Sequence, residues 1–193
     1  MEIKVPVEVS ARHVHLKKED VIALFGSGHR LKVLRLLTQP RDFAAEEILD
    51  IEVGGKTIKG LRVVGPERTA SQVEVSLTDA ISLGIDTPVR MSGDLTGSAP
   101  ITLIGPAGRV NLLEGLIIAM RHLHCNPEQA KKLKLRNGQI VAVKTGSREV
   151  IFKNIPVRIG EGYNLCLHLD TDEGNAAGIN RKGEGILLKK IKI

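Results

Sequence analysis

Four of the six histidines lie in two copies of the sequence Arg-His-x-His, at Arg12–His15 and Arg121–His124. On a β-strand, residues i and i+2 point to the same face, about 6.6 Å apart along the chain. Two imidazoles at this spacing can chelate one metal ion. A single His-x-His is as easily a pair of exposed or hydrogen-bonded histidines. Two copies, each preceded by arginine and each at the end of an expected strand, favour metal binding.

Three further side chains could take part in such chemistry. Glu74 shares one face of an expected strand with Gln72 and Ser76, and this polar face is either exposed to solvent or lines a site. His168 lies between two leucines where another expected strand leads into a helix. Arg68 follows a Gly-Pro pair, and its planar guanidinium can hold phosphate through two parallel hydrogen bonds.

The cysteines and the remaining histidine carry less information. The chain has two cysteines, Cys125 and Cys166, which excludes a disulfide scaffold and fits a reducing cytosol. Each lies close to a histidine pair or to His168 and could be a ligand, and a buried structural thiol is the alternative. His29 lies in a glycine-containing loop with no expected partner, and we assign it no role.

The composition restricts the class of ligand. The net charge of +6 fits either a generally basic surface or an anionic ligand. Nucleic acid is the weaker candidate, because aromatic residues make up only 2% of the chain and no basic run is present. A phosphorylated small molecule would use the same charge. No apolar run reaches the roughly 18 residues of a membrane span, so we expect a soluble, cytoplasmic protein without a membrane partner.

The elements that would position these residues are short. The patterns predict helices at 16–25, 30–37 and 78–83, and after Asn126-Pro127 and Asp170 or Thr171. They predict a hairpin around Gly54-Gly55. Further strands are expected at 2–9, 61–64, 72–76, 89–92, 101–104, 115–120 and 139–143.

The second half of the chain repeats the opening. Both copies of the motif follow a strand and precede a helix, with Glu19 and Glu128 at the same offset. We predict a mainly β fold of two small β-barrels related by internal duplication, with short α-helices capping and connecting them. The first barrel would comprise residues 1–11 and 115–193, and the second residues 12–114, so that the units exchange their first strands.

Four ordered segments of the chain carry a family resemblance. Ser-Ala-Arg-His-Val-His-Leu, Gly-Pro-x-Arg-x3-Gln-Val-Glu, Ala-Met-Arg-His-Leu-His and His-Leu-Asp-Thr-Asp-Glu-Gly-Asn-Ala resemble the motifs of the PduL-type phosphate propanoyltransferases. The resemblance covers nearly the whole chain. It implies a phosphotransacylase that moves an acyl group between coenzyme A and phosphate, with two β-barrels, two zinc ions and association as a homodimer. It also suggests propanediol degradation in a bacterial microcompartment, although many members begin with an amphipathic targeting helix and this chain starts at the first strand.

The resemblance implies roles position by position. One zinc ion would be held by His13, His15 and Glu74, with a position left for the sulfur of coenzyme A. The other would be held by His122, His124 and His168, with positions for water or phosphate. Arg68 would bind phosphate, with Gln72 assisting it in catalysis. The positions that resemble coenzyme A contacts are Ser10, Lys56, Arg62 and Asn175.

We therefore expect the reaction of acyl-coenzyme A with phosphate to give acyl phosphate and coenzyme A, with propanoyl or acetyl as the acyl group. Direct attack of phosphate on the thioester is expected, because no nucleophile–base pair is evident. Cys125 is the residue that could overturn this. A zinc-dependent hydrolase of a thioester or amide is the alternative enzyme, and a barrel that only binds a metal or an anion is the third hypothesis.

Overall fold

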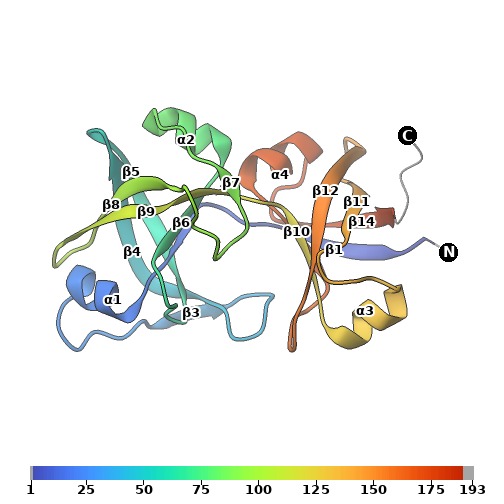
Figure 1. Ribbon diagram of the computed structural model, residues 1–193, viewed down its shortest axis with the longest axis horizontal. Coiled ribbons are helices and arrows are strands. Elements are labelled where there is room, and N and C mark those ends of the chain that lie inside the picture. Colours follow the sequence, from blue (N-terminus) through green and yellow to red (C-terminus); the bar gives the residue numbers. More distant parts are fainter. Residues whose placement is uncertain (1, 189–193) are drawn as a thin grey trace. The chain divides into compact units, whose positions relative to one another are not determined.

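The computed structural model describes residues 2–188, which form two compact units (Figure 1). Unit 1 comprises Met1–Ala11 and Met120–Ile193, and unit 2 comprises Arg12–Ala119. The division falls after residue 119, five residues beyond the expected boundary. Residue 1 and residues 189–193, which the prediction included in the first barrel, lie outside the described residues. Within the described part of the chain, no helix is both long and apolar enough to span a membrane.

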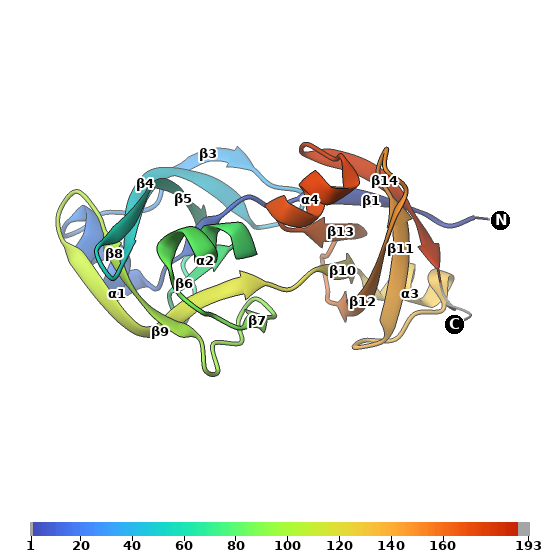
Figure 2. The ribbon, with the colours of Figure 1, turned by 90° about the horizontal axis from the view of Figure 1, so that it is seen from above.

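Unit 2 is a barrel with two added edge strands. Its elements are β2 (His13–His15), α1 (Lys18–Phe25), β3 (Val33–Leu36), β4 (Phe43–Val53), β5 (Lys56–Gly65), β6 (Gln72–Val75), α2 (Leu77–Leu83), β7 (Val89–Arg90), β8 (Ala99–Ile104) and β9 (Arg109–Ala119). The pairing runs β4–β5–β2–β6–β9–β8 and returns to β4, so six strands close a ring (Figure 2). β3 pairs with β4, and β7 pairs with β9.

Unit 1 is a second closed barrel. Its elements are β1 (Lys4–Val9), β10 (His122–Cys125), α3 (Pro127–Leu133), β11 (Ile140–Thr145), β12 (Val150–Ile159), β13 (Cys166–Leu169), α4 (Thr171–Ala177) and β14 (Lys182–Leu188). The strand order is β1–β13–β10–β12–β11–β14. The prediction of a mainly β fold with two small barrels and short helices is confirmed.

The two barrels have the same pattern of strand pairing. The series β2-α1-β4-β5-β6-α2-β8-β9 of unit 2 corresponds, step by step, to β10-α3-β11-β12-β13-α4-β14-β1 of unit 1. Each parallel and antiparallel pair of one ring has its counterpart in the other. The strand that completes unit 1 is therefore β1, from the start of the chain.

Alternation along the strands places the histidines outside the barrels. Val14 and Leu123, the central residues of the two His-x-His sequences, are fully buried in the aliphatic cores of unit 2 and unit 1. Because neighbouring side chains on a strand point to opposite faces, the histidines on either side of each must lie on the outer face. The same rule applies to β6 and β13, where valines and leucines fill the cores.

One predicted helix is wrong, and one histidine has a partner that the sequence did not reveal. Residues 30–37 contain β3 rather than a helix, because the backbone of Val33–Leu36 pairs with β4. The Lys32 amide donates to the Glu47 carboxylate beside it. His29 bonds to Glu47 through Nε2 at 2.7 Å and stacks on Phe25. The Gly54-Gly55 hairpin is confirmed, with positive φ at both glycines as a type I′ turn requires.

Candidate functional site

Three donor side chains of unit 2 meet because of strand register. β2 and β6 are antiparallel, with His13 opposite Glu74 and His15 opposite Gln72. Paired residues point to the same face of a sheet, so all four side chains lie on the outer face of the barrel. Glu74 and His15 are buried there.

The distances between the donor atoms fit a metal ion. Nε2 of His13 lies 3.1 Å from Nε2 of His15, and each of these nitrogens lies 3.7 Å from an oxygen of Glu74. Ligands about 2.0 to 2.1 Å from a tetrahedral zinc ion are about 3.3 Å from one another. The carboxylate reaches His13 with Oε2 and His15 with Oε1, so the two imidazoles and the carboxylate have about the spacing of ligands around such an ion.

The protonation of His15 suits a ligand. Its Nδ1 lies 3.0 Å from the carbonyl oxygen of Val64, which can only accept, so Nδ1 carries the proton and Nε2 presents its lone pair. A second hydrogen bond of this kind orients most metal-binding histidines. Burial, and then the charges of His13 and Arg68, lower the pKa of His15 to about 3. His15 is therefore neutral at pH 7.

Glu74 is held by a short chain of hydrogen bonds. The Gln72 amide donates to Glu74 Oε1 at 2.6 Å, and its own oxygen accepts from the backbone of Gly93 at 2.7 Å. Burial works to raise the pKa of Glu74, but the neighbouring His13 and His15 outweigh it and hold that pKa below its usual range. Glu74 is thus a carboxylate fixed toward the two imidazoles.

Arg68 is connected to this group through Ser92. Arg68 Nη1 and Gln72 Nε2 both donate to the Ser92 hydroxyl oxygen at 3.0 Å. The backbone of Arg68 is fixed by its amide, which donates to the Leu16 carbonyl just after β2. The predicted site residues of unit 2 therefore form one connected group, with guanidinium and carboxylate on either side of Ser92.

Two residues near the donor group of unit 2 were not predicted from the sequence. Ser92 lies just after β7, in a segment that the sequence analysis expected only as a strand. Asp42 lies close enough for Arg68, His13 and Glu74 to influence its pKa, which burial raises above its usual range. Neither residue belongs to a motif, and the turns that bring them here follow no local pattern.

The donors of unit 1 occupy equivalent positions. β10 and β13 are antiparallel, with His122 opposite His168 and His124 opposite Cys166. His168 thus takes the place that Glu74 has in unit 2. On the far side of β13, Glu8 of β1 lies opposite His168.

The three imidazole rings of unit 1 form a cluster. The ring centroids of His122 and His124 are 4.5 Å apart, and His168 lies 5.2 and 5.1 Å from them. His122 Nδ1 lies 2.9 Å from the Met120 carbonyl oxygen, so Nδ1 carries the proton and Nε2 has the lone pair. The predicted three-histidine set is therefore brought together with one nitrogen already oriented as in a ligand.

His124 has an unusual environment. It is 7% exposed, and both ring nitrogens are buried with no hydrogen-bond partner in the described part of the chain. Burial, followed by His122, His168 and Arg158, lowers its pKa to about 2. Tyr163, which the sequence analysis did not consider, stacks on the ring at 4.2 Å. Buried polar atoms nearly always have a partner, so a neutral imidazole left without one indicates a ligand other than the described residues.

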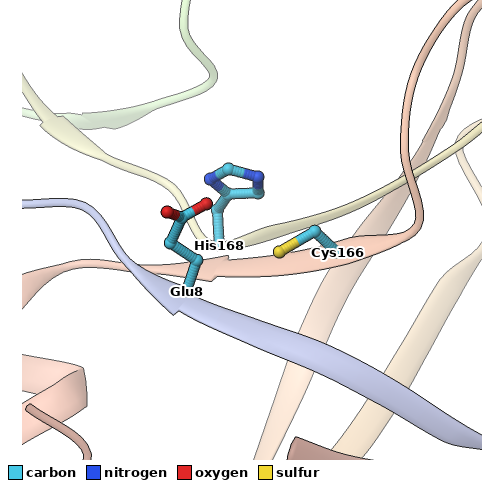
Figure 3. A group of neighbouring side chains, drawn as sticks. All are labelled: Glu8, Cys166 and His168. Atoms are coloured by element: carbon cyan, nitrogen blue, oxygen red, sulfur yellow. The ribbon is translucent and has the colours of Figure 1, made fainter. Parts of the chain in front are cut away.

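Glu8 and Cys166 add two donor atoms beside His168. One ligand atom from each of the three residues lies within 4.8 Å of the others, and all three side chains extend from the same side of β1 and β13 (Figure 3). Burial and the charge of Glu8 raise the pKa of Cys166 to about 12. Cys125, by contrast, points into the core of the barrel.

The arginine of each motif binds a helix rather than a histidine in the structure. Arg12 donates to Asp79 at 2.8 Å, and Arg121 donates to Glu173. Both carboxylates occupy the third position of a capping box, in α2 and α4 respectively. In both copies the arginine thus joins the His-x-His strand to the helix that follows the antiparallel partner strand, α2 after β6 and α4 after β13.

The four predicted coenzyme A contacts are distributed over both units. Ser10 follows β1, where its amide donates to the Leu169 carbonyl, and Asn175 lies in α4. In unit 2, Arg62 lies beside His13 in the register, but its guanidinium donates to the carbonyl oxygens of residues 45 and 46. Lys56 begins β5 at the hairpin. Within unit 2, only Arg62 adjoins the donor group.

Comparison with known proteins points to one family. The family model of phosphate propanoyltransferases matches residues 6–180. A phosphate propanoyltransferase of Thermotoga maritima is 46% identical over 177 residues, which cover 90% of this chain and 84% of the relative. One of Lachnoclostridium phytofermentans is 45% identical over 91% of this chain and 83% of the relative. One of Listeria monocytogenes is 42% identical over 100% of this chain and 91% of the relative.

Proposed function

The chain belongs to the phosphate propanoyltransferase family, and on that premise we propose that it transfers a short acyl group, propanoyl or acetyl, between coenzyme A and inorganic phosphate. The main structural support for this proposal is the group of donor side chains around Glu74 in unit 2. There a three-donor set with the spacing of a zinc site is joined by hydrogen bonds to Arg68. A metal-only module would not require the guanidinium, and an anion-binding module would not require the donors.

The donor types of both sets suit zinc, and in unit 2 the donor atoms also have about the spacing of zinc ligands. His13, His15 and Glu74 would hold one ion, and His122, His124 and His168 would hold the other. Neutral imidazole and carboxylate are ligands that zinc accepts, and three protein ligands leave a position for a substrate, as in catalytic zinc sites. When bound, such ions would stabilise the thiolate of coenzyme A and offset the charge of phosphate.

The side chains of the protein would bind and orient the reactants. Arg68 would bind phosphate oxygens through its planar guanidinium, and the bond from Nη1 to Ser92 helps to fix the direction of this group. Gln72 is a positioning residue in this account, because its amide is fully engaged by Glu74, Ser92 and Gly93.

The bond changes are those of a direct displacement. A phosphate oxygen attacks the thioester carbonyl carbon, the carbon–sulfur bond breaks, and the electron pair leaves with the sulfur of coenzyme A. Holding two anions and the thioester together removes much of the entropic cost of their encounter. Cys125 lies in the core of unit 1, and the Ser92 hydroxyl, which interacts with Glu74, also accepts from Arg68 and Gln72.

The remaining predictions from the family resemblance concern coenzyme A contacts, assembly and location, and they stay proposals. Ser10, Lys56, Arg62 and Asn175 would contact coenzyme A. Association as a homodimer, a part in propanediol degradation and enclosure in a microcompartment also stay predictions.

The function is tested by release of coenzyme A from propanoyl- and acetyl-coenzyme A with and without phosphate. We expect release to require phosphate and to be accompanied by acyl phosphate in equal amount. Release at the same rate without phosphate would support a thioester hydrolase instead.

A further inference from the structure

Two donor side chains of unit 1 have no part in the proposed transfer. Glu8 and Cys166 flank His168 on the outer face of the barrel, with ligand atoms within 4.8 Å of one another (Figure 3). Cys166 is 1% exposed, whereas Glu8 is half-buried. The ammonium of Lys182, whose side chain is largely exposed, lies 3.9 Å from the Glu8 carboxylate. A buried thiol and a carboxylate are thus held close together beside His168.

Strand register, rather than side-chain flexibility, produces this grouping. Glu8 lies opposite His168 across the parallel β1–β13 pair, and Cys166 precedes His168 by two residues on β13. All three therefore point away from the core, which Val7 and Leu167 fill from the same strands. The ligand atoms can move by side-chain rotation, but their Cα atoms are fixed by the closed barrel.

The next strand carries a histidine of the three-histidine set. His124 lies opposite Cys166 in the β10–β13 register, on the same outer face. Its ring nitrogens are both buried and have no hydrogen-bond partner among residues 2–188. An imidazole in that state costs free energy unless something binds it.

Unit 2 serves as the internal comparison. The positions equivalent to Glu8 and Cys166 are Ile117, opposite Glu74 on β9, and Gln72, opposite His15. Isoleucine cannot bind a metal, and the Gln72 amide is used by neighbouring residues of the chain. The additional donors are therefore a property of unit 1 and not of the repeated fold.

We propose that Glu8, Cys166 and His168 form a further metal-binding group in unit 1, which takes a divalent ion of intermediate softness such as Zn²⁺ or Co²⁺. The ligands are a thiolate, a carboxylate oxygen and an imidazole nitrogen, a mixed set that suits these ions better than Mg²⁺ or Ca²⁺. Binding releases the thiol proton to solvent as the sulfur bonds to the ion. The group goes beyond the proposed function and shares His168 with the three-histidine set.

Cobalt gives a direct readout of the sulfur ligand. Co²⁺ is added to the metal-free full-length protein, and absorption is recorded in the near-ultraviolet, where a thiolate bound to Co²⁺ produces a charge-transfer band. The band is expected in the wild type and in Cys125→Ser, whose thiol lies in the core, and is expected to disappear in Cys166→Ser. Bound Co²⁺ without the band, or a band that persists in Cys166→Ser, would overturn the proposal.

Two further variants separate this group from the three histidines. In His122→Ala/His124→Ala the band is expected to persist, because all three proposed ligands remain. Its loss from the folded variant would show that no independent group exists. Glu8→Gln, at a half-buried position that tolerates the amide, is expected to weaken Co²⁺ binding at the band by about 10- to 100-fold. Unchanged affinity would remove Glu8 from the group.

The readout is independent of enzymatic activity. A variant that loses phosphate-dependent release of coenzyme A but keeps the band leaves this proposal standing. A chain that transfers propanoyl groups but shows no band refutes this proposal and leaves the proposed function intact. Circular dichroism of each variant confirms folding, and Cys166→Ala replaces Cys166→Ser where the serine variant does not fold.

Discussion

The two units place different donors on the same scaffold. Glu74 and His168 occupy equivalent positions, each opposite the first histidine of its His-x-His strand. One set is therefore two imidazoles and a carboxylate, and the other is three imidazoles. A zinc ion would keep a net charge of about +1 in unit 2 and about +2 in unit 1, counting the ligand charges alone. The strand pairing fixes the positions of the metal-binding side chains. The residue type at each position sets the net charge of the site and so which substrate group it would attract.

The family resemblance implies different parts for the two donor sets. The three-histidine set would leave positions for water or phosphate, and the set with Glu74 would leave a position for the sulfur of coenzyme A. Arg68 lies in unit 2, so it adds positive charge where the carboxylate has removed some. The two barrels thus reach comparable charge by different means, and removing parts from each shows whether both contribute.

The largest expected effect is that of removing the metal. A chelator is expected to abolish phosphate-dependent release of coenzyme A, and zinc is expected to restore it, because both donor sets would lose their ion. Mg²⁺ is the control, since it prefers oxygen ligands and octahedral geometry. Full activity in metal-free protein would rule out a part for metal in the transfer.

Arg68→Ala is expected to reduce kcat/KM for phosphate by about 100-fold or more, since it removes a charged donor pair from the site. Zinc content should be unchanged, because Arg68 is not a ligand. Arg68→Lys keeps the charge but loses the planar guanidinium, so its kcat/KM for phosphate is expected to lie between those of the wild type and Arg68→Ala. Unchanged kinetics in Arg68→Ala would remove Arg68 from the mechanism.

The metal-free protein is expected to be less stable at pH 5 than at pH 7. The pKa values of His15 and His124 are lowered to about 3 and about 2, so below pH 6.5 the unfolded state binds protons that the folded state does not. Falling pH therefore favours unfolding. Asp170 opposes this, because its pKa is raised to about 6 by burial and it gains stability as pH falls.

Together, the contributions of these three groups are expected to lower the free energy of unfolding by roughly 2 kcal/mol between pH 7 and pH 5. Urea titrations at the two pH values measure it, and His15→Gln and His124→Gln each should reduce the dependence. Equal stability at pH 5 and 7 would contradict the burial of neutral imidazoles in both units.

The smallest effects concern the motif arginines. Arg121→Ala is expected to lower the free energy of unfolding by about 1 to 2 kcal/mol, because Arg121 also donates to the Lys153 carbonyl and lies over Phe152. Arg12 pairs with Asp79 and is half exposed, so Arg12→Ala should cost about 0.5 kcal/mol. Thermal unfolding and zinc content are measured together. Loss of zinc without loss of stability would assign these arginines to the metal sites.

The sequence was informative where the pattern is local. The outward direction of the histidines follows from alternation around Val14 and Leu123, and the caps of α3 and α4 follow from Asn126 and Asp170. The pairing of Glu74 and His168 with these strands depends on register across the sheet, so only the family resemblance supplied it.

Other features of the sites could not be predicted because they depend on distant segments. Ser92 and Tyr163 reach the donor groups through loops without a motif. Glu8 had a signal, since it alternates with Val7 and Val9 on β1, but its neighbour Cys166 comes from the other end of the chain. The helix expected at residues 30–37 failed because edge pairing with β4 satisfied the backbone instead.

The central claim is that each unit holds its own ion and that both ions are needed for transfer. The most direct measurement is zinc bound per folded chain, with activity, in three proteins that all carry Cys166→Ser to remove the sulfur ligand. The first has no other change, the second adds His13→Ala/His15→Ala, and the third adds His122→Ala/His124→Ala. We predict two ions with activity in the first protein, and one ion without activity in each of the others. Two ions retained in either histidine variant, or full activity with one ion, would contradict the account.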